Sequence, residues 1–197
     1  MVILKHPDSR VLKTVAKQLR AGAVVVFPTD TAYALGCDAT NKKAVAKIFK
    51  IKGRDASKAL PMIVADIKMA KKFFELETRH AQLATHWPGP LSMIVKAKKA
   101  IVLGALSKGT GAVRVPDSAA ARELSKDASR PLVATSANVS GRPACYSVKA
   151  YLTQLGRNCA PDIVLDAGAL RRRRPSTIVK IGKDGRIEVL RKGSIKL

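Results

Sequence analysis

The chain has 197 residues, enough for one domain to bury about two thirds of its unfolded surface without help from disulfides or a structural metal. Its 37 lysines and arginines outnumber its 14 aspartates and glutamates, and the net charge of +23 is far more than solubility requires. This charge favours an anionic partner, such as a nucleotide, an RNA or an anionic membrane surface, and does not choose among them.

The sequence lacks the usual marks of a secreted, membrane-spanning or metal-stapled protein. Cys37, Cys145 and Cys159 are far apart and form no CxxC pair, which argues against a disulfide framework and a zinc site. The first residues do not resemble a signal peptide, and no apolar run approaches membrane-spanning length. We therefore expect a soluble, cytoplasmic protein with no membrane partner.

Helical and strand patterns alternate along the first quarter of the chain. A helix is predicted to begin at Asp8, because apolar residues follow at helical spacing, and to end at Gly22. The apolar run 23–27 predicts a buried strand. A second amphipathic run predicts a helix with Asn41 as its N-cap and Lys52 at its end.

The alternation continues to the end of the chain. Further strands are predicted over 60–64, 91–97, 112–115, 132–135, 163–165, 177–181 and 187–190, and further helices near 66–75, 78–86, 117–128 and 147–155. Loops are predicted over 98–111, 140–147 and 167–175. Asp184-Gly185 is a tight-turn signal, so the last two strands should form a hairpin. These patterns predict an α/β fold, and we expect residues 1–197 to form one domain.

Four polar residues at the ends of two predicted elements are candidates for one anion site. Lys52 and Arg54 close the second helix, and Ser136 and Asn138 follow the strand over 132–135. The two cations can hold phosphate or carboxylate oxygens, and the two neutral side chains can add hydrogen bonds to the same ligand. The alternative is a solvated helix end and an ordinary strand-to-loop turn.

Two more predicted strands end in polar residues. Thr29, Asp30 and Thr31 follow the first strand, and Arg114 lies at the end of a later one. Because ligands of open α/β sheets bind beyond the carboxyl ends of strands, we expect these residues to share the pocket. The alternatives are turn capping by the Thr and Asp side chains, and an ion pair between Arg114 and Asp117.

Six short blocks stand out along the chain: Pro28-Thr29-Asp30-Thr31, Lys52-Gly53-Arg54, Trp87-Pro88-Gly89-Pro90-Leu91, Ala112-Val113-Arg114-Val115-Pro116, Thr135-Ser136-Ala137-Asn138-Val139-Ser140-Gly141 and Pro175-Ser176-Thr177-Ile178-Val179. In order and spacing these blocks resemble the landmarks of the YrdC-like family, and they cover nearly the whole chain. The likeness is to the short, single-domain TsaC-type form, because no residues are left for the additional C-terminal domain of the longer form.

The resemblance implies a fold and a reaction. The fold is a twisted mixed β-sheet flanked by helices, with a large positively charged concave cavity. The reaction is that of an L-threonylcarbamoyladenylate synthase, a nucleotidyltransferase that condenses L-threonine, bicarbonate and ATP to threonylcarbamoyl-AMP and pyrophosphate. A partner enzyme then transfers the threonylcarbamoyl group to adenosine 37 of tRNA.

The resemblance also implies roles for the matching residues. The threonine would be held by Thr31, Arg114 and Ser176. The ATP side would be lined by Arg54, Lys58, Thr110, Ser136 and Arg191. The catalytic group, near the reacting carbonate and phosphate, would be Lys52, Arg54, Ser136 and Asn138. Mg²⁺ is expected with the triphosphate, although no carboxylate cluster marks a site for it, and turn capping is favoured for Asp30 and Asp38.

The chain departs from the family pattern near the expected site. Ala34 stands where glycine is common, Asp55 where proline is usual, and Ala59 within a loop that commonly reads Lys-Pro-Leu. The added methyl group of Ala34 is expected to narrow the site, whereas Asp55 and Ala59 favour a more mobile loop around Lys58. The run 171–174, four arginines, replaces a neutral, glycine-rich loop, and it is either a solvated basic loop or an overhang that attracts triphosphate or tRNA.

Two other functions fit the same sequence. The basic cavity could belong to a module that binds double-stranded RNA or tRNA without catalysis. With one Trp, three Tyr and four Phe, such binding would be mainly electrostatic and salt-sensitive. The chain could also be a carbamoyl-transfer domain that acts on another acceptor, although the accessory domains of such proteins are missing.

Overall fold

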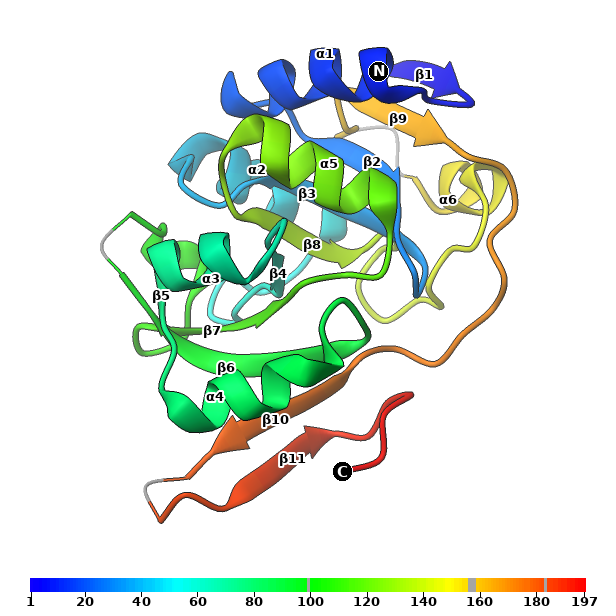
Figure 1. Cartoon of the computed structure of the whole chain (residues 1–197). Coiled ribbons are helices and arrows are strands. Elements are labelled where there is room, and N and C mark those ends of the chain that lie inside the picture. Colours follow the sequence, from blue (N-terminus) through cyan, green and yellow to red (C-terminus); the bar gives the residue numbers. More distant parts are fainter. Residues whose placement is uncertain (99, 156–158, 183) are drawn as a thin grey trace.

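The computed structural model describes residues 1–98, 100–155, 159–182 and 184–197 (Figure 1). Its strands are β1 (Val2–Lys5), β2 (Val25–Pro28), β3 (Tyr33–Asp38), β4 (Met62–Ile63), β5 (Phe74–Glu75), β6 (Leu91–Ala97), β7 (Thr110–Arg114), β8 (Leu132–Ser136), β9 (Ile163–Asp166), β10 (Thr177–Ile181) and β11 (Ile187–Arg191). Its helices are α1 (Ser9–Arg20), α2 (Lys42–Lys52), α3 (Ile67–Phe73), α4 (Thr78–Leu83), α5 (Ala119–Ala128) and α6 (Val148–Gln154). Two short 3₁₀ turns, Ala84–His86 and Leu103–Ala105, complete the set of regular elements in these ranges.

In the described residues all eleven strands belong to one sheet, in the order β1-β9-β2-β3-β8-β4-β7-β6-β10-β11, with β5 paired to β6 outside this path. The pairing is mixed, because β2 lies antiparallel to β3 and parallel to β9. The predicted α/β fold with a mixed sheet flanked by helices is therefore confirmed.

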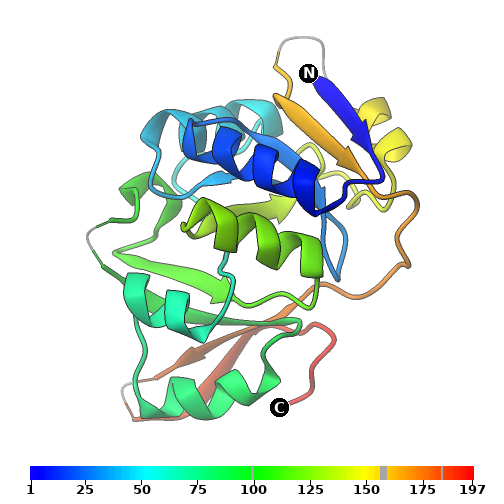
Figure 2. The ribbon, with the colours of Figure 1, turned by 45° about the horizontal axis from the view of Figure 1, so that its top comes forward.

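Helices cover the sheet on both faces. Along β2 the side chains alternate, so Val25 and Phe27 pack into the cluster that contains α1 and α5. Figure 2 shows these two helices side by side over the sheet. Val24 and Val26 belong to the other core cluster, which contains Ile48 of α2. A fully apolar run is what a strand with helices on both faces requires.

The predicted helix starts are confirmed by their caps. Asp8 Oδ1 accepts a hydrogen bond from Val11 N at 2.8 Å, and Asn41 Oδ1 accepts one from Ala44 N at 3.1 Å. The helix α2 ends at Gly53, whose φ of 58° lies in the left-handed region that glycine adopts without strain. This left-handed residue turns the chain sharply at the end of the helix.

The sequence does not predict β3, the fourth strand in the sheet order. All of its residues are buried, and they pair with both β2 and β8. Polar residues precede this strand and a glycine lies in its centre, so the sequence pattern does not indicate a strand here. A Cβ on Gly36 would overlap the carbonyl oxygen of Val133 and approach the Phe27 ring, so this close pairing needs a glycine.

The other differences are at element ends. β1 is an exposed edge strand and gives no apolar pattern. The helix predicted near 66–75 ends at Phe73, because the next two residues pair with β6 as β5. The predicted loop 98–111 contains the first residues of β7. The hairpin of β10 and β11 is confirmed.

Strand direction decides how the predicted polar ends meet. β2 and β8 are both antiparallel to β3, so they run the same way and end at the same edge. β7 is parallel to β4, which is antiparallel to β8, so β7 runs the opposite way. The predicted shared pocket is nevertheless formed, because the long side chain of Arg114, the last residue of β7, meets the polar residues of the β2–β3 loop.

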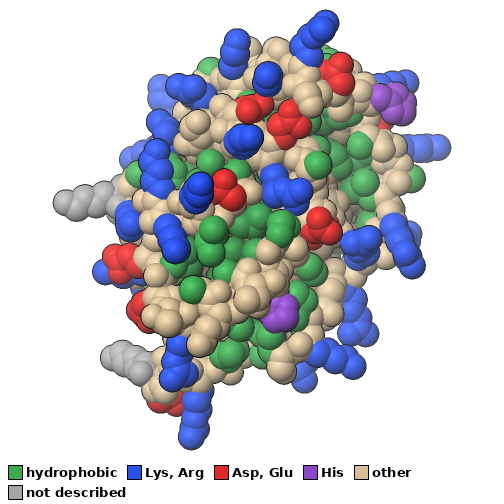
Figure 3. All heavy atoms as spheres, viewed as in Figure 1, with side chains coloured by type: hydrophobic (Ala, Val, Ile, Leu, Met, Phe, Trp, Pro, Cys, Tyr) green, Lys and Arg blue, Asp and Glu red, His purple; other side chains and the backbone are tan. Residues whose placement is uncertain are grey.

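Lysine and arginine side chains are spread over the face shown in Figure 3 and do not gather there in one patch. Among the described residues, none of the helices is long and apolar enough to cross a bilayer.

Candidate active site

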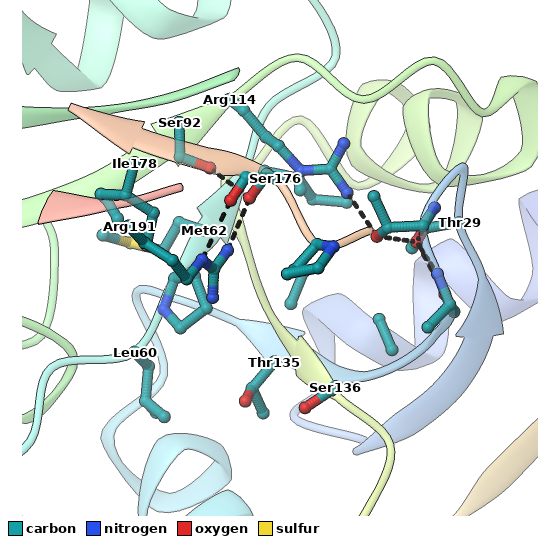
Figure 4. A pocket seen from close by; sticks show the side chains of 18 of the residues that line it. Thr29, Leu60, Met62, Ser92, Arg114, Thr135, Ser136, Ser176, Ile178 and Arg191 are labelled. Carbon is teal, nitrogen blue, oxygen red and sulfur yellow. Dashed lines mark hydrogen bonds between the residues drawn. The ribbon is translucent and has the colours of Figure 1, made fainter. Parts of the chain in front are cut away.

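A cavity of about 500 Å³ lies where the β2–β3 loop, β7, β8, β10 and β11 meet (Figure 4). The predicted site residues that line it are Thr31, Arg54, Thr110, Arg114, Ser136, Ser176 and Arg191. Lys52, Lys58 and Asn138 are not among the lining residues. Within the described part of the chain, the charged side chains in the lining are Arg54, Arg114, Arg173 and Arg191, and no carboxylate joins them. The cavity is therefore suited to anions.

The β2–β3 loop is held by Thr29, which is buried. Its Oγ1 donates to Ala32 O at 2.6 Å and accepts from Thr31 N at 3.2 Å. The predicted role of turn capping is confirmed for Thr29. The turn leaves the Thr31 hydroxyl on the cavity wall, 3.1 Å from Thr29 Oγ1 and within 3.4 Å of Arg114 Nη2.

Arg114 is fixed by a buried ion pair with Asp30. Nη1 of Arg114 donates to both oxygens of Asp30, at 2.7 and 2.9 Å. The side chains of Arg114 and Asp30 are 9% and 2% exposed. The alternative pairing of Arg114 with Asp117 is wrong, since Asp117 lies 3.7 Å from Arg122 instead.

Ser176 and Arg191 form a second polar cluster next to Arg114. Arg191 donates from Nε to Ser176 O at 2.9 Å and from Nη2 to Ser176 Oγ at 2.8 Å. A shift in register between β10 and β11 opposite Arg191 accompanies this arrangement, as β-bulges often redirect a side chain. Burial, and then the positive charge of Arg114, lower the pKa of Arg191.

Sequence reasoning missed Ser92, and its prediction that Asp30 caps a turn is wrong, because both Asp30 oxygens accept hydrogen bonds from Arg114. Ser92 is 2% exposed, and its Oγ lies 3.0 Å from Ser176 Oγ inside the cavity lining. A lone serine in the apolar strand 91–97 is the signal that could have marked it. No local pattern could have paired Asp30 with Arg114, which is 84 residues away.

Lys52 lies behind the cavity wall and holds the loop after β8. It is 2% exposed, and its Nζ donates to Ser136 O at 2.6 Å, to Asn138 O at 2.8 Å and to Asn138 Oδ1 at 3.1 Å. Ser136 Oγ donates to Asn138 Oδ1 at 2.5 Å. Burial, and then the charge of Arg54, lower the pKa of Lys52 to about 8. The structure therefore joins three of the predicted catalytic residues, with Ser136 alone of the three in the cavity lining.

Arg54 reaches the cavity from the turn after α2. Its Nη2 donates to Ala59 O at 3.2 Å, and its Nε is buried without a hydrogen-bond partner among the described residues. A buried guanidinium N–H without an acceptor is costly, and an anionic ligand would satisfy it. Thr110 lines the same cavity, with its hydroxyl donating to Ser107 O at 2.8 Å.

The Sua5/YciO/YrdC family model, described as telomere recombination, matches residues 17–193. The chain belongs to this family. A threonylcarbamoyl-AMP synthase of Vibrio vulnificus (strain YJ016) is 34% identical over 190 residues, which cover 92% of this chain and 98% of the relative. A putative threonylcarbamoyl-AMP synthase of Methanocaldococcus jannaschii is 33% identical, over 95% of this chain and 88% of the relative.

Solved structures place this member of the Sua5/YciO/YrdC family beside the longer Sua5. A double mutant of P. abyssi Sua5 matches all of this chain with a TM-score of 0.89 and 29% identity, and the chain spans 61% of that protein. P. abyssi Sua5 complexed with L-threonine matches 98% of this chain, and 57% of its own length, with a TM-score of 0.85 and 29% identity. YciO of E. coli, at 24% identity, shares the fold, with a TM-score of 0.82 over 98% of this chain and 93% of its own length.

The departures of this Sua5/YciO/YrdC protein lie on and beside the cavity. Ala34 and Ala59 are both lining residues. Asp55 is exposed, and its Oδ1 accepts from Ser57 N at 2.9 Å, while Lys58 N donates to Asp55 O at 3.2 Å. The aspartate thus caps the turn where the family commonly has proline.

The lowered pKa of Lys52 predicts a pH-dependent contribution to stability. Between pH 8 and about 10.5 the unfolded chain holds a proton on Lys52 that the folded protein has lost, so the free energy of unfolding increases as the pH rises. Relative to Lys52→Met, the free energy of unfolding of the wild type should increase by about 3 kcal/mol across this window. Urea unfolding of both proteins at pH 7.5 and pH 10 measures the difference, in which other titrating groups cancel. A difference that does not change with pH would contradict the burial of a charged Lys52.

Proposed function

We propose that this chain is a threonylcarbamoyl-AMP synthase, a nucleotidyltransferase that condenses L-threonine, bicarbonate and ATP and releases pyrophosphate. The observation that carries the proposal is one cavity whose lining, among the described residues, holds Arg54, Arg114, Arg173 and Arg191 and no carboxylate. Relatives named threonylcarbamoyl-AMP synthase and the solved complex of Sua5 with L-threonine support it.

The end of the cavity around Arg114 suits an amino acid. Arg114 and Ser176 both line the cavity, and Figure 4 shows their side chains near each other. The Ser176 hydroxyl accepts a hydrogen bond from Arg191 Nη2 at 2.8 Å. A guanidinium is well matched to the α-carboxylate of threonine. The Thr31 hydroxyl lies beside it and can bond the polar groups of the same ligand.

The other end suits a nucleotide. Arg54 and the Ser136 hydroxyl supply donors for phosphate oxygens, and the unsatisfied Nε of Arg54 would find an acceptor there. Apolar side chains in the lining can pack on a purine base; they include Leu60, Met62, Ile94, Ile178 and Leu190.

The reaction needs alignment more than a reactive side chain. The neutral amine of threonine adds to the carbon of bicarbonate, and water leaves as the carbamate forms. An oxygen of this carbamate then attacks the α-phosphorus while pyrophosphate leaves. No covalent enzyme intermediate is required, so holding the substrates together and stabilising charge on the phosphate oxygens can supply the catalysis. Lys52 acts, in this proposal, by fixing Ser136 and Asn138 on the loop beside the nucleotide.

The residues that the structure describes do not form a dedicated magnesium site. Asp30 is committed to Arg114, and Asp38 accepts from the backbone N and the hydroxyl of Thr40, at 2.7 and 2.8 Å. Within the described residues, no group of three or more His, Cys, Asp and Glu side chains is arranged to hold a metal. We propose that Mg²⁺ enters with ATP as part of the substrate.

The product points to further partners. A threonylcarbamoyl-adenylate is a mixed anhydride and would be passed to a tRNA threonylcarbamoyl-transfer enzyme in the cytoplasm. Direct binding of tRNA or double-stranded RNA by this chain is the alternative role that its net charge of +23 favours.

One assay tests the function against its alternatives. The pure protein is incubated with ATP, Mg²⁺, labelled bicarbonate and L-threonine, and pyrophosphate and labelled adenylate are measured. We expect release of pyrophosphate that requires both threonine and bicarbonate. Salt-sensitive RNA binding without such release would instead support a binding module. Release without threonine, or with another amine, would indicate a carbamoyl-transfer domain for a different acceptor.

The four arginines 171–174 lie in the segment between β9 and β10, on the outside of the molecule (Figure 1). Tyr146 fixes this segment, because its OH donates to Arg173 O at 3.1 Å and its ring lies 5.7 Å from the guanidinium of Arg172. Arg173 lines the main cavity. We therefore propose that residues 171–174 overhang the cavity and attract the triphosphate, and that they do not form a freely solvated loop.

Replacing all four arginines by alanine should raise KM for ATP about fivefold and leave kcat unchanged, because exposed cations steer an anion without touching the reacting atoms. The effect should shrink in 0.5 M salt. Steady-state kinetics at two ionic strengths measures it. A control with the same loss of charge elsewhere replaces Arg20, Lys42, Lys43 and Arg130, which surround a separate surface hollow. Equal effects of the two quadruple variants would show that residues 171–174 act only through the overall charge of the protein surface.

A further inference from the structure

Thr177 is a buried residue whose hydroxyl holds the chain that follows β11. It is the first residue of β10 and is 1% exposed. Its Oγ1 accepts hydrogen bonds from Gly193 N at 3.2 Å and from Ile195 N at 3.1 Å, and it donates to Ile195 O at 2.8 Å. A hydroxyl has one donor and two acceptor sites, so all the hydrogen bonds that Thr177 Oγ1 can make go to this part of the backbone.

The chain after β11 lies directly against the start of β10. Gly193 is buried, and a Cβ on it would overlap backbone atoms of residues 175–177. Two backbones meet here without a side chain between them, and such a close approach requires a glycine. Ser194 N also donates to Pro175 O at 3.2 Å. We call residues 193–195 the clamp, because they hold the start of β10 from outside.

The clamp holds two side chains of the cavity in place. Ser176 lines the cavity and is 7% exposed, with its Oγ 3.0 Å from Ser92 Oγ. Arg191, two residues before Gly193, also lines the cavity and donates to Ser176 twice, from Nε to O at 2.9 Å and from Nη2 to Oγ at 2.8 Å (Figure 4). The positions of Ser176 and Arg191 therefore depend on where the chain after β11 is held.

We propose that Thr177 is a positioning residue, which fixes Ser176 and Arg191 on the cavity wall by holding the clamp. Side chains alternate along this segment, so Ser176 and Ile178 line the cavity and Thr177 does not. The Thr177 hydroxyl thus acts through its neighbours and does not touch a substrate. The inference rests on the proposed function, because the binding of the proposed substrates reports the positions of Ser176 and Arg191.

The physical argument is the cost of leaving backbone groups unpaired. Without the Thr177 hydroxyl, two N–H groups and one C=O group of the clamp would lose their partner beside a buried residue, so the clamp would move toward water. Arg191 would move with it and Ser176 would lose two hydrogen bonds. The family resemblance implies that Ser176 serves L-threonine and Arg191 serves ATP, so both substrates should bind more weakly.

The test compares Thr177→Val, which keeps the shape of the side chain and loses the hydroxyl, with Thr177→Ser, which keeps the hydroxyl. Initial rates of pyrophosphate release over ranges of L-threonine and of ATP with Mg²⁺ give KM for each substrate. We expect Thr177→Val to raise both KM values about tenfold and Thr177→Ser to stay within about twofold of the wild type.

This measurement separates positioning from stability. KM does not depend on how much of the protein is folded, so a purely structural role would lower the amount of active protein and leave KM unchanged. Wild-type KM values in Thr177→Val would overturn the inference. The same rise of KM in Thr177→Ser as in Thr177→Val would overturn it too, because the hydroxyl would then not be the group that matters.

Ser125→Ala is the matched control. Ser125 on α5 is 0% exposed, its Oγ donates to Arg130 O at 2.8 Å, and it does not line the cavity. This variant also removes a buried hydroxyl that serves the backbone, and both KM values should stay at those of the wild type. A rise equal to that of Thr177→Val would overturn the inference, because loss of any buried hydroxyl would then have the same effect.

Gly193→Ala tests the clamp from its other side, and it decides the matter if Thr177→Val does not fold. The added Cβ must push the backbone of residues 175–177 away, so both KM values should rise. Unchanged KM values in Gly193→Ala would overturn the inference. Absence of pyrophosphate release by the wild type would count against the proposed function instead.

Discussion

Replacing Arg54 by methionine should lower kcat/KM for ATP by about a hundredfold while leaving the protein at least as stable as the wild type. The loss follows from removing charge-assisted hydrogen bonds to phosphate, each worth about 1.5–3 kcal/mol. The stability follows from the buried, unsatisfied Nε, because methionine removes the cost of burying that donor, which offsets the loss of the one Nη2 hydrogen bond to Ala59 O. Initial rates over a range of ATP concentrations, with thermal unfolding of the same samples, measure both effects.

Arg10→Met is the matched control for this prediction. Arg10 is an exposed residue of α1, on the helical layer that packs with α5, and it does not line the cavity. Its variant should keep the wild-type dependence on ATP. If Arg54→Met behaves like Arg10→Met in the assay, Arg54 does not bind the nucleotide, whatever its place in the cavity.

Replacing Lys52 by methionine should abolish turnover, with a loss of about a thousandfold, while the fold survives. The variant removes three hydrogen bonds that hold the carbonyl groups of Ser136 and Asn138 and the Asn138 side chain. The Ser136 hydroxyl would then lose its place in the cavity. The buried oxygens left without donors should lower the free energy of unfolding by about 2 kcal/mol at pH 7. Single-turnover rates and urea unfolding measure the two effects.

Lys47→Met, on the same helix, is the control for Lys52→Met, because it removes a lysine that does not belong to the site. Lys47 pairs with Asp162 at 2.6 Å, and both side chains are partly exposed, so its removal should cost less than about 1 kcal/mol and leave turnover intact. Equal rates for Lys52→Met and the wild type would show that the loop after β8 does not take part in the reaction.

Helix ends and buried strands could be predicted from residues that are close together in the chain. The caps Asp8 and Asn41 and the left-handed Gly53 need only their neighbours in the chain, and all three positions were predicted as helix boundaries or closing residues. The strand β8 is an apolar run that a central position in the sheet permits. The fold class and the family followed from such segments and from the order of the six blocks.

Partners across the fold could not be predicted in the same way. That Arg114 binds Asp30 and not the nearby Asp117 depends on the direction of β7 relative to β2. That Lys52 lies behind the wall, with three oxygens around its ammonium group, depends on how α2 packs against β3, the strand that pairs with β8. The block pattern predicts which residues gather, and the packing decides which of them face the cavity.

The position of Arg191 on the outermost strand links occupancy of the site to local motion. Within the described ranges, β11 is exposed along its whole length and pairs only with β10, so this hairpin is the part of the sheet that frays at least cost. A nucleotide held by Arg191 on the ATP side of the cavity would tie this edge of the sheet to the ligand. Binding of the nucleotide would then slow backbone hydrogen exchange in the hairpin, far more than in the layer of α1 and α5, and the edge strand would report whether the site is filled.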